Sequence, residues 1–371
     1  MFATGLALLL GYAAWLGRDI SFFSDDWPII AFHHNGDYLT PYGGHLLLVP
    51  IGIFHALWVT VGLTSYTPYL IVGLIGYAAF SIVLYLYLRR RVAPMLAALA
   101  ALSIVWFSAA QLNVLFPILL NFTVPMAATV VIWMLLDRNE VRYDIAAGAC
   151  LAIALADGGV GLVTLAAVGT ELLILRAPVR RWLPFVPPFV LWCAWYAGYH
   201  TPVTNPNSIG GTIRFSLHEI QATFAAFAGG SDAGGYVLLA ATAAVFALAI
   251  VRWHTLNARA VAALAAAAAF AALTGYSARH GSLPAIPADT PRYLWLNAFL
   301  IVAALVEVVR GRRLPPVVTV VAAALVAVGA ITLVGNLRSY HHEVVQYKRS
   351  TRTFMVAVSY THLTLPTILR V

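Results

Sequence analysis

The sequence predicts an all-α fold: a polytopic transmembrane helical bundle of about eleven spans, with a juxtamembrane helix in its first external loop. Two observations predict this fold class. Of the 371 residues, 61% are hydrophobic and only 10% are charged, with a mean hydropathy of +0.85. A soluble domain carries about 25% charged residues, because its surface must meet water. Long continuous apolar runs also recur from end to end, whereas a membrane barrel would show alternation.

The apolar runs, taken in order, give the expected spans. Crossing ~30 Å of hydrocarbon takes about 20 helical residues, and most of the runs approach that length. They are about Phe2–Leu16, Tyr66–Leu88, Pro94–Ala110, Phe122–Leu136, Tyr143–Ala156, Val160–Leu175, Trp182–Tyr199, Tyr236–Val251, Ala260–Tyr276, Tyr293–Val309 and Pro316–Val334.

The arginines orient these spans. They form clusters between the runs: Arg89-Arg90-Arg91, Arg138 with Arg142, Arg176 with Arg180-Arg181, Arg252 with Arg259, and Arg310 with Arg312-Arg313. Such clusters are typical of cytoplasmic loops, so the net charge of +8 indicates membrane orientation and no nucleic-acid partner. With every cluster inside, His45–Leu63 cannot span and should lie on the outer surface. The outer segments Arg18–Gly44, His200–Gly235 and Ser277–Arg292 are rich in Gly, Pro, Asn and Ser, and we expect loops there.

The two ends of the chain differ from the rest. No basic residue precedes the first run at Phe2, which is short for a span and leaves open an incomplete N-terminus. The stretch Val358–Thr367 resembles translated sequencing adapter. We therefore expect one transmembrane domain over residues 1–357 and a non-native tail over residues 358–371.

The most informative stretch is Phe22-Phe-Ser-Asp25-Asp26-Trp-Pro28, directly after the first run. Adjacent carboxylates at a bilayer surface repel each other and lose hydration, which costs free energy, so their presence indicates a functional role. The plain alternative is a solvated turn in which an Asp caps a helix beginning near Pro28.

The order of features around this pair resembles the GT-C superfamily of integral-membrane glycosyltransferases. That superfamily includes protein O-mannosyltransferases and actinobacterial arabinosyl- and mannosyltransferases. Its members place an acidic pair in the first external loop, followed by juxtamembrane helices and a span with a basic inner end. The residues that carry the resemblance are Phe22–Pro28, His45–Pro50 and Arg292-Tyr293. The topology resembles the superfamily over most of the chain.

The resemblance implies a bacterial plasma-membrane enzyme with its active site on the external face. It would transfer a sugar, with inversion, from a polyprenyl-phosphate donor to a glycan, lipid or protein acceptor. Asp25 and Asp26 would be catalytic. A carboxylate is suited to take the proton of the attacking hydroxyl, and a like-charged neighbour raises the pKa of one member of the pair.

Further residues are implied in substrate binding: His45, Asp157, Arg279, Arg292 and Tyr293. Asp157 begins an Asp-Gly-Gly turn, which could equally be a simple polar turn. Arg279 and Arg292 bracket one external loop, where they could bind the donor phosphate or anchor helices at the headgroups.

Two smaller expectations concern other charged groups. His33, His34 and Asp37 could hold a divalent metal ion beside the acidic pair, although their spacing matches no defined motif. Glu171 and Glu307 should form local ion pairs with Arg176 and Arg310.

Two other functions fit the same composition. A transporter or flippase of a lipid-linked envelope precursor would place ionisable residues near the bilayer midplane, where these apolar runs have almost none. A non-catalytic assembly subunit could keep the same fold, since fold does not fix function.

Overall fold

The computed structural model describes residues 1–33, 37–199, 206–253, 256–278 and 286–368, with backbone only at 31–33, 252–253 and 350–368. Its regular elements are all helical, apart from one isolated β-bridge between Tyr42 and His45. The α-helices are α1 (Phe2–Gly17), α2 (Asp26–His33), α3 (Leu48–Val61), α4 (Thr67–Arg89), α5 (Pro94–Val105), α6 (Gln111–Leu115), α7 (Leu120–Leu136), α8 (Val141–Ala156), α9 (Val160–Ile174), α10 (Val179–Trp182), α11 (Val186–Tyr199), α12 (Ile209–Phe227), α13 (Asp232–Leu248), α14 (Ala258–Ser277), α15 (Pro291–Val308) and α16 (Pro316–Ile368). Short helical turns lie at η1 (Pro117–Leu119), η2 (Leu183–Phe185) and η3 (Ala249–Trp253).

Among the described residues, six helical segments are long and apolar enough to cross a membrane. They are Thr67–Arg89, Pro117–Leu136, Asp232–Val251, Ala258–Ser277, Pro291–Val308 and Pro316–Arg349. Shorter apolar helices cover Phe2–Gly17, Leu48–Val61, Pro94–Val105 and Val160–Ile174. The prediction of an all-helical chain with several membrane-spanning helices is therefore confirmed in its coarse form.

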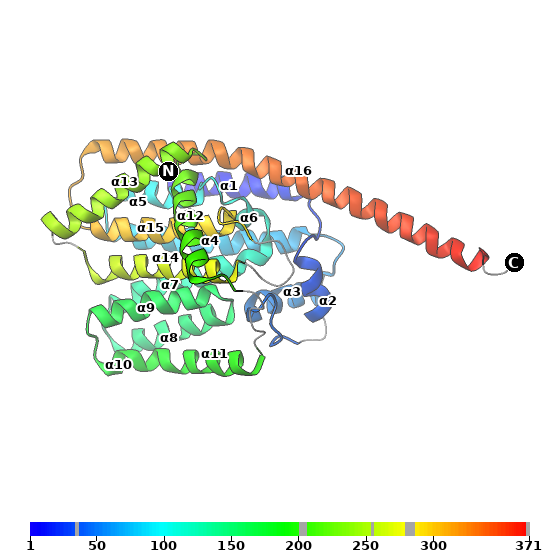
Figure 1. Cartoon of the computed structure of the whole chain (residues 1–371), viewed down its shortest axis with the longest axis horizontal. Coiled ribbons are helices and arrows are strands. Elements are labelled where there is room, and N and C mark those ends of the chain that lie inside the picture. Colours follow the sequence, from blue (N-terminus) through cyan, green and yellow to red (C-terminus); the bar gives the residue numbers. More distant parts are fainter. Residues whose placement is uncertain (34–36, 200–205, 254–255, 279–285, 369–371) are drawn as a thin grey trace.

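Most of the helices lie roughly along one common axis and form a bundle (Figure 1). α7 packs against α8 and α4, and α14 packs against α9 and α15. α2 and α3 lie together at one end of the bundle, beside the beginning of α4 (Figure 1). We call this the α2–α3 end, and the opposite end, where α4, α7 and α15 finish, the arginine-rich end.

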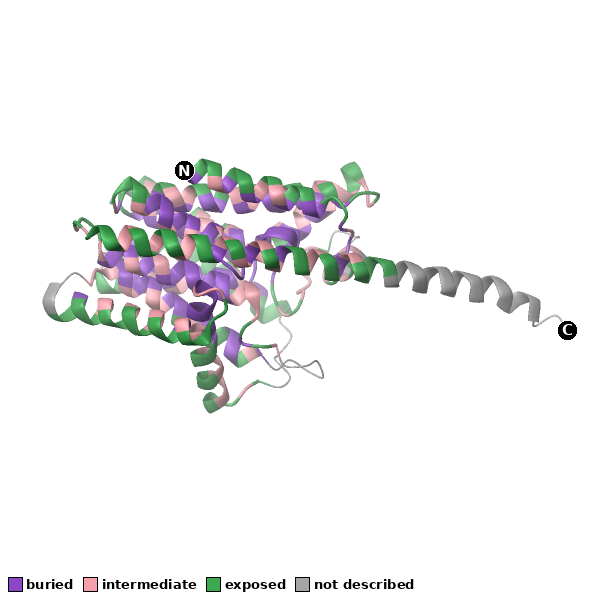
Figure 2. Cartoon of the chain, turned by 90° about the horizontal axis from the view of Figure 1, so that it is seen from above, coloured by how far each residue is buried: buried purple, intermediate pink, exposed green. Residues whose placement is uncertain are grey.

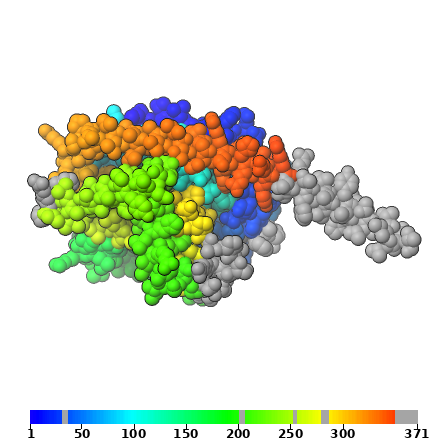
Figure 3. Space-filling model, turned by 45° about the horizontal axis from the view of Figure 1, so that its top comes forward, coloured from blue at the N-terminus to red at the C-terminus, as the bar shows by residue number. Residues whose placement is uncertain are grey.

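Two helices present apolar side chains to the outside rather than to the core. In both α13 and α16, only 11% of the most apolar stretch is buried. Their exposed flanks are visible in Figure 2, and Figure 3 shows both helices on the surface. Exposed apolar helices of this length are what a hydrocarbon environment favours.

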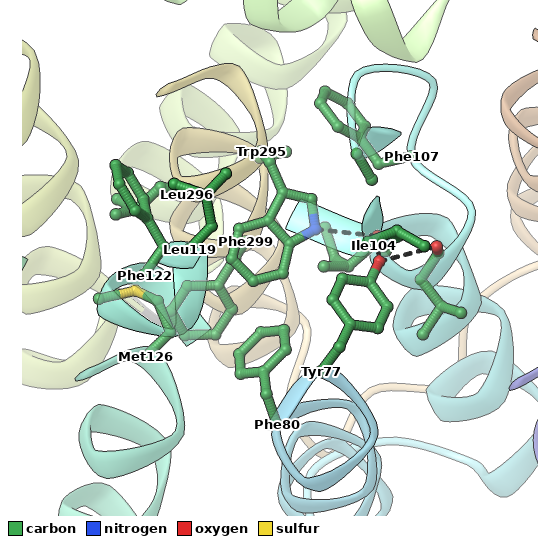
Figure 4. Packing of buried hydrophobic residues seen from close by; sticks show 14 of the residues in the cluster. Tyr77, Phe80, Ile104, Phe107, Leu119, Phe122, Met126, Trp295, Leu296 and Phe299 are labelled. Atoms are coloured by element: carbon green, nitrogen blue, oxygen red, sulfur yellow. Dashed lines mark hydrogen bonds between the residues drawn. The ribbon is translucent and has the colours of Figure 1, made fainter. Parts of the chain in front are cut away.

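The centre of the bundle is an aromatic core shared by α4, α5 and α15 (Figure 4). Trp295 is fully buried, and its indole N–H donates to the carbonyl of Ile104 at 3.3 Å. The hydroxyl of Tyr77 donates to the carbonyl of Val105 at 2.9 Å, and Phe80 meets the Trp295 ring edge-on at 5.0 Å. Without water, such polar tips must be satisfied within the protein. These contacts fix the start of α15 relative to α4 and α5.

The arginine-rich end is held by buried ion pairs between distant helices. Arg259 donates through Nε to both carboxylate oxygens of Glu171 at 3.1 Å, and its Nη1 lies 2.7 Å from Asp137. Arg91 pairs with Asp137 and with Glu307, the latter at 3.0 Å. The expected partner of Glu171 was therefore wrong.

The other expected local pair is only a weak contact. Arg310 lies 3.7 Å from Glu307 and remains half-exposed, whereas the closer partner of Glu307 is Arg91. A cavity of about 210 Å³ lies among these groups, and its lining includes Asn257 and Arg181. Arg181 in turn pairs with Asp144 at 3.1 Å. The buried charges at this end are paired with one another, so they hold the helices together.

The segment His200–Gly235 contains a helix where a loop was expected. α12 begins after Ser208, whose hydroxyl accepts a hydrogen bond from the Gly211 N–H at 3.1 Å. Its inward face carries Glu219, which is buried against α14 and α15. The turn-forming residues that suggested a loop flank this helix or occupy its first turn, where an N-cap tolerates them.

α16 also differs from expectation, because it continues as one helix well beyond Val334 (Figure 1). Asn336 donates to the carbonyl of Ser108 at 2.7 Å, and Arg338 donates to the hydroxyl of Tyr12 at 2.9 Å. These polar contacts hold the continuation against α1 and the turn after α5. It thereby reaches the α2–α3 end.

Candidate functional site

The acidic pair lies at the α2–α3 end, where two aromatic anchors fix the chain leading into it. Phe22 meets the ring of Tyr69 edge-on at 4.9 Å, and Phe23 packs on Phe116 at 4.8 Å. Ser24 follows with a φ of 49°, a conformation that few non-glycine residues adopt. This sharp turn directs the two following carboxylates into different environments.

Asp26 is completely buried, so the alternative of a solvated turn does not hold for this carboxyl. It is the first residue of α2, and its Oδ2 accepts a hydrogen bond from the backbone N–H of Phe23 at 3.1 Å. Oδ1 has no hydrogen-bond partner among the described residues. Burial raises the pKa of Asp26 to about 8, with the Phe23 N–H opposing and the Asp25 charge adding to the shift. Asp26 is therefore mostly a neutral acid at pH 7.

Asp25 is only partly buried and has a different partner. The hydroxyl of Tyr42 donates to its Oδ1 at 2.9 Å. Burial is the main cause that raises the pKa of Tyr42, the Asp25 charge adds to it, and the Arg292 charge lowers it. Tyr42 thus remains a hydrogen-bond donor at neutral pH, and Arg292 is near enough to act on it electrostatically.

Tyr42 is the first residue of a tight turn that ends at His45. Backbone hydrogen bonds of 3.0 Å run both ways between these two residues. The intervening Gly43 and Gly44 have φ values of 57° and 79°, and positive φ at both central residues is what a two-residue type I′ hairpin requires. Glycine adopts this conformation without steric cost, which explains the Tyr-Gly-Gly-His sequence.

The far side of the turn meets the loop between α8 and α9. A Cβ built on Gly159 would lie 2.8 Å from Nδ1 of His45, so only a glycine leaves room for the ring. A Cβ built on Gly158 would lie 3.3 Å from the side chain of Leu47. His45 is exposed, whereas Asp157, two residues before Gly159, is fully buried. The structure therefore brings His45 and the Asp157 turn together.

Asp157 is the most isolated carboxyl group at this end. Neither of its oxygens has a hydrogen-bond partner among the described residues. Burial raises its pKa well above the ordinary value for an aspartic acid. The side-chain oxygen of the neighbouring Asn121 is also buried and unpartnered. Such groups are costly to bury and mark a place where a polar ligand would find partners.

Arg292 and Tyr293 begin α15. The guanidinium of Arg292 lies over the ring of Tyr293, 5.3 Å from its centroid. Tyr293 packs on the rings of Phe122 at 6.4 Å and Phe270 at 5.7 Å. Tyr293 thus fixes the first turn of α15 to α7 and α14, while Arg292 remains partly exposed at the helix start.

Two further tyrosines surround Asp26 and were missed as site residues. Tyr66 is buried beside it: burial raises the pKa of Tyr66, and the charge of Asp26 adds to the shift. Tyr340 of α16 packs on Phe23 at 6.1 Å and interacts electrostatically with Asp26. The sequence analysis includes Tyr66 only as the first residue of an expected span, and no sequence signal connects Tyr340 to a loop about three hundred positions away. The sequence signal for Tyr42 was its place next to Gly-Gly in the acidic loop.

The remaining predicted residues are placed only in part. Arg279 and His34 lie outside the described residues, and His33 ends α2 with its side chain outside them. Asp37 is exposed and accepts a hydrogen bond from the backbone N–H of Thr40 at 3.3 Å. Within the described ranges no three His, Cys, Asp or Glu side chains converge on a metal position. The metal site stays a prediction.

The residues brought together at the α2–α3 end can perform acid–base chemistry. One carboxyl is partly exposed and hydrogen-bonded, two are buried and neutral, and the Arg292 guanidinium acts electrostatically on Tyr42. Comparison with known proteins finds no matching family model, no matching curated protein and no matching solved structure.

Proposed function

We propose that this chain is a membrane glycosyltransferase of the GT-C type. It would transfer a sugar from a polyprenyl-phosphate donor to an acceptor, with inversion at the anomeric carbon. The observation that carries the proposal is the unequal acidic pair, in which Asp25 is accessible and hydrogen-bonded whereas Asp26 is buried with a pKa of about 8. Unequal neighbouring carboxyls are a common arrangement in sites that must hold both charged and neutral acids.

The proposed topology is that expected from the arginines. Eleven spans would cross the membrane, with the arginine-rich end in the cytoplasm and the α2–α3 end outside. α3, with 14 residues, would be the juxtamembrane helix, because placing every arginine cluster in the cytoplasm leaves no crossing for it. The acidic pair would then face the external side, in a bacterial plasma membrane.

Asp25 is the general base in this proposal. As the acceptor oxygen bonds to the anomeric carbon, its proton passes to the Asp25 carboxylate. The bond from that carbon to the phosphate oxygen breaks, and the lipid phosphate leaves with the electron pair. Asp26 cannot perform this role at neutral pH, since its raised pKa keeps it largely protonated and its carboxyl is buried.

The leaving phosphate needs positive charge. Arg292 can supply it at the start of α15, where free backbone N–H groups and the helix dipole add to the effect. On the other side, the neutral Asp157 carboxyl could donate a hydrogen bond to a sugar hydroxyl, and His45 could accept one. Arg279 remains a second candidate for the phosphate, and a divalent metal on His33, His34 and Asp37 remains a prediction.

A transporter of a lipid-linked precursor is the second candidate, and Glu219 favours it. This buried carboxyl accepts hydrogen bonds from Thr274 of α14 at 2.6 Å and from Asn297 of α15 at 2.5 Å. Ionisable groups buried among spanning helices often serve translocation. The buried ion pairs favour the transferase. They hold helices together at the arginine-rich end, which is opposite the acidic pair, so the α2–α3 end is available for chemistry.

One experiment separates these functions. The purified protein in detergent is incubated with a panel of radiolabelled polyprenyl-phosphate sugars and crude envelope acceptors, and products are resolved from donors. A transferase releases lipid phosphate and labels an acceptor. A transporter does neither but moves fluorescent lipid-linked precursor across proteoliposomes, with Glu219→Gln impaired. Activity in neither assay would support a non-catalytic assembly subunit and end the proposal.

A further inference from the structure

The turn Tyr42-Gly43-Gly44-His45 connects two parts of the candidate site that are far apart in sequence. Its first residue donates a hydrogen bond to Asp25, which precedes α2. Its last residue lies against Gly159, between α8 and α9. We propose that this turn is a positioning element of the site, and that Tyr42 is the positioning residue for the Asp25 carboxylate. The role rests on the proposed function, but the contacts themselves do not.

The turn is rigid for reasons visible in its backbone. Reciprocal hydrogen bonds of 3.0 Å close it, and both central glycines hold positive φ. The residues that follow, Leu46 and Leu47, are buried and lead directly into α3. A short closed turn anchored in this way transmits little motion, so its two ends keep a fixed separation.

Each end of the turn is anchored by packing. Tyr42 is half-buried, with its ring packed against the main hydrophobic core. On the other side, Leu47 is nearly fully buried and approaches Gly158. The hydroxyl of Tyr42 therefore extends from a held ring, and its contact with Asp25 constrains a side chain that is otherwise partly exposed.

A general base needs such a constraint. The carboxylate must meet the acceptor hydroxyl at hydrogen-bond distance and in a narrow range of angles. Asp25 follows the strained Ser24 and lacks burial to fix its rotamer. One Asp25 oxygen bonded to Tyr42 leaves the other free for the acceptor. Tyr42 would thus act through Asp25 and need not touch the substrate.

The test measures the carboxylate directly. Wild type and Tyr42→Phe, which keeps the ring and removes the hydroxyl, are labelled with a water-soluble carbodiimide and an amine from pH 4 to 8. Tandem mass spectrometry then quantifies modification at Asp25. Because the carboxylate loses the hydrogen bond that holds its side chain against Tyr42, we expect labelling of Asp25 in Tyr42→Phe to be several-fold faster.

The glycines provide a matched comparison. At Gly43, Gly44 and Gly311, which all have positive φ, an added Cβ would meet no atom within 4 Å. Alanine therefore introduces the same backbone strain in each case, and Gly311 lies at the arginine-rich end. We expect Gly43→Ala and Gly44→Ala to change Asp25 labelling as Tyr42→Phe does, and Gly311→Ala to leave it at the wild-type value.

Transfer assays on the same variants complete the test. We expect Tyr42→Phe to lower kcat by about 10- to 100-fold, with the donor KM within about twofold of wild type. If Asp25 labels identically in wild type and Tyr42→Phe, the positioning role is wrong, whatever the enzyme does. If Tyr42→Phe labels differently but the wild-type protein transfers no sugar, the proposed function is overturned, and the turn then has no catalytic role. Altered labelling with unchanged kcat would also refute the positioning role.

Discussion

Arg259, at the start of α14, donates through Nε to both carboxylate oxygens of Glu171, near the end of α9, at 3.1 Å. Both side chains are buried, so each neutralises a charge that would otherwise be stranded without water. Removing Glu171 would leave Arg259 with Asp137, a carboxylate that Arg91 also shares, and a buried charge with less compensation is more damaging than the loss of an exposed pair.

Glu171→Gln should therefore destabilise the protein by about 3–5 kcal/mol, measured as a fall in the melting temperature in detergent. Glu140→Gln provides the matched control, because Glu140 pairs with Arg142 at 2.8 Å with both side chains largely exposed. We expect that control to change stability by less than about 1 kcal/mol. Equal effects of the two substitutions would show that the Arg259 pair does not hold α9 to α14.

The buried Asp26 gives a prediction for pH. Its pKa is about 8 in the folded protein against 3.8 for the exposed group, so the folded state holds a proton that the unfolded state releases. Stability contributed by this proton is fully present below pH 4 and is lost as the pH rises to 8. At ~1.4 kcal/mol per pKa unit, the loss reaches up to about 6 kcal/mol.

Asp26→Asn should remove this pH dependence. We expect wild type to melt at a lower temperature at pH 8.5 than at pH 5.5, while Asp26→Asn loses much less over the same interval. Asp19→Asn serves as the control, because Asp19 is 61% exposed in the same loop. A melting curve for Asp26→Asn that falls as steeply as wild type would contradict the burial of this carboxyl.

The topology can be tested with single cysteines in a background where Cys150 and Cys193 are replaced by Ala. Asp19→Cys at the α2–α3 end should react with a membrane-impermeant thiol reagent in intact cells. Arg90→Cys and Arg313→Cys, at the arginine-rich end, should react only after the membrane is opened. Labelling of Arg90→Cys from outside would overturn the orientation and the juxtamembrane role of α3.

The donor phosphate gives a prediction for Arg292. Arg292→Ala should weaken binding of the polyprenyl-phosphate donor by about 1.5–3 kcal/mol, or roughly 10- to 150-fold. Arg292→Lys should restore only part of the donor affinity, since Lys keeps the charge but cannot form a bidentate hydrogen bond with the phosphate. Donor binding and melting temperature are measured together. A lower melting temperature with normal donor affinity would make Arg292 an anchor for α15.

The sequence predicts the spanning helices well where an apolar run ends in arginine. α4, α14 and α15 lie within a few residues of their expected bounds, because hydropathy and charge there agree. α12 was missed because Gly210 and Gly211 resemble a loop, whereas in the structure they occupy the first turn of an amphipathic helix. Its face becomes apparent only when α14 and α15 are in place.

The site could be predicted only in part for the same physical reason. Asp25, Asp26 and His45 lie in one loop, and their residue types indicate chemistry from sequence alone. Tyr340, which packs on Phe23 and interacts electrostatically with the buried Asp26, comes from α16, far along the chain. Similarly, Glu171 pairs with Arg259 rather than its sequence neighbour, because long-range packing decides which charges share a buried space.

The central claim is that Asp25 is the base of a sugar transfer, and one comparison tests it most directly. Initial rates of transfer from a polyprenyl-phosphate sugar are measured for wild type, Asp25→Asn and the loop control Asp19→Asn at saturating donor. The account predicts that Asp25→Asn lowers kcat by a factor of ~100 or more, while Asp19→Asn stays near wild type. Donor binding and melting temperature should change little in both variants, because Asp25 is partly exposed. Wild-type transfer by Asp25→Asn would contradict the account.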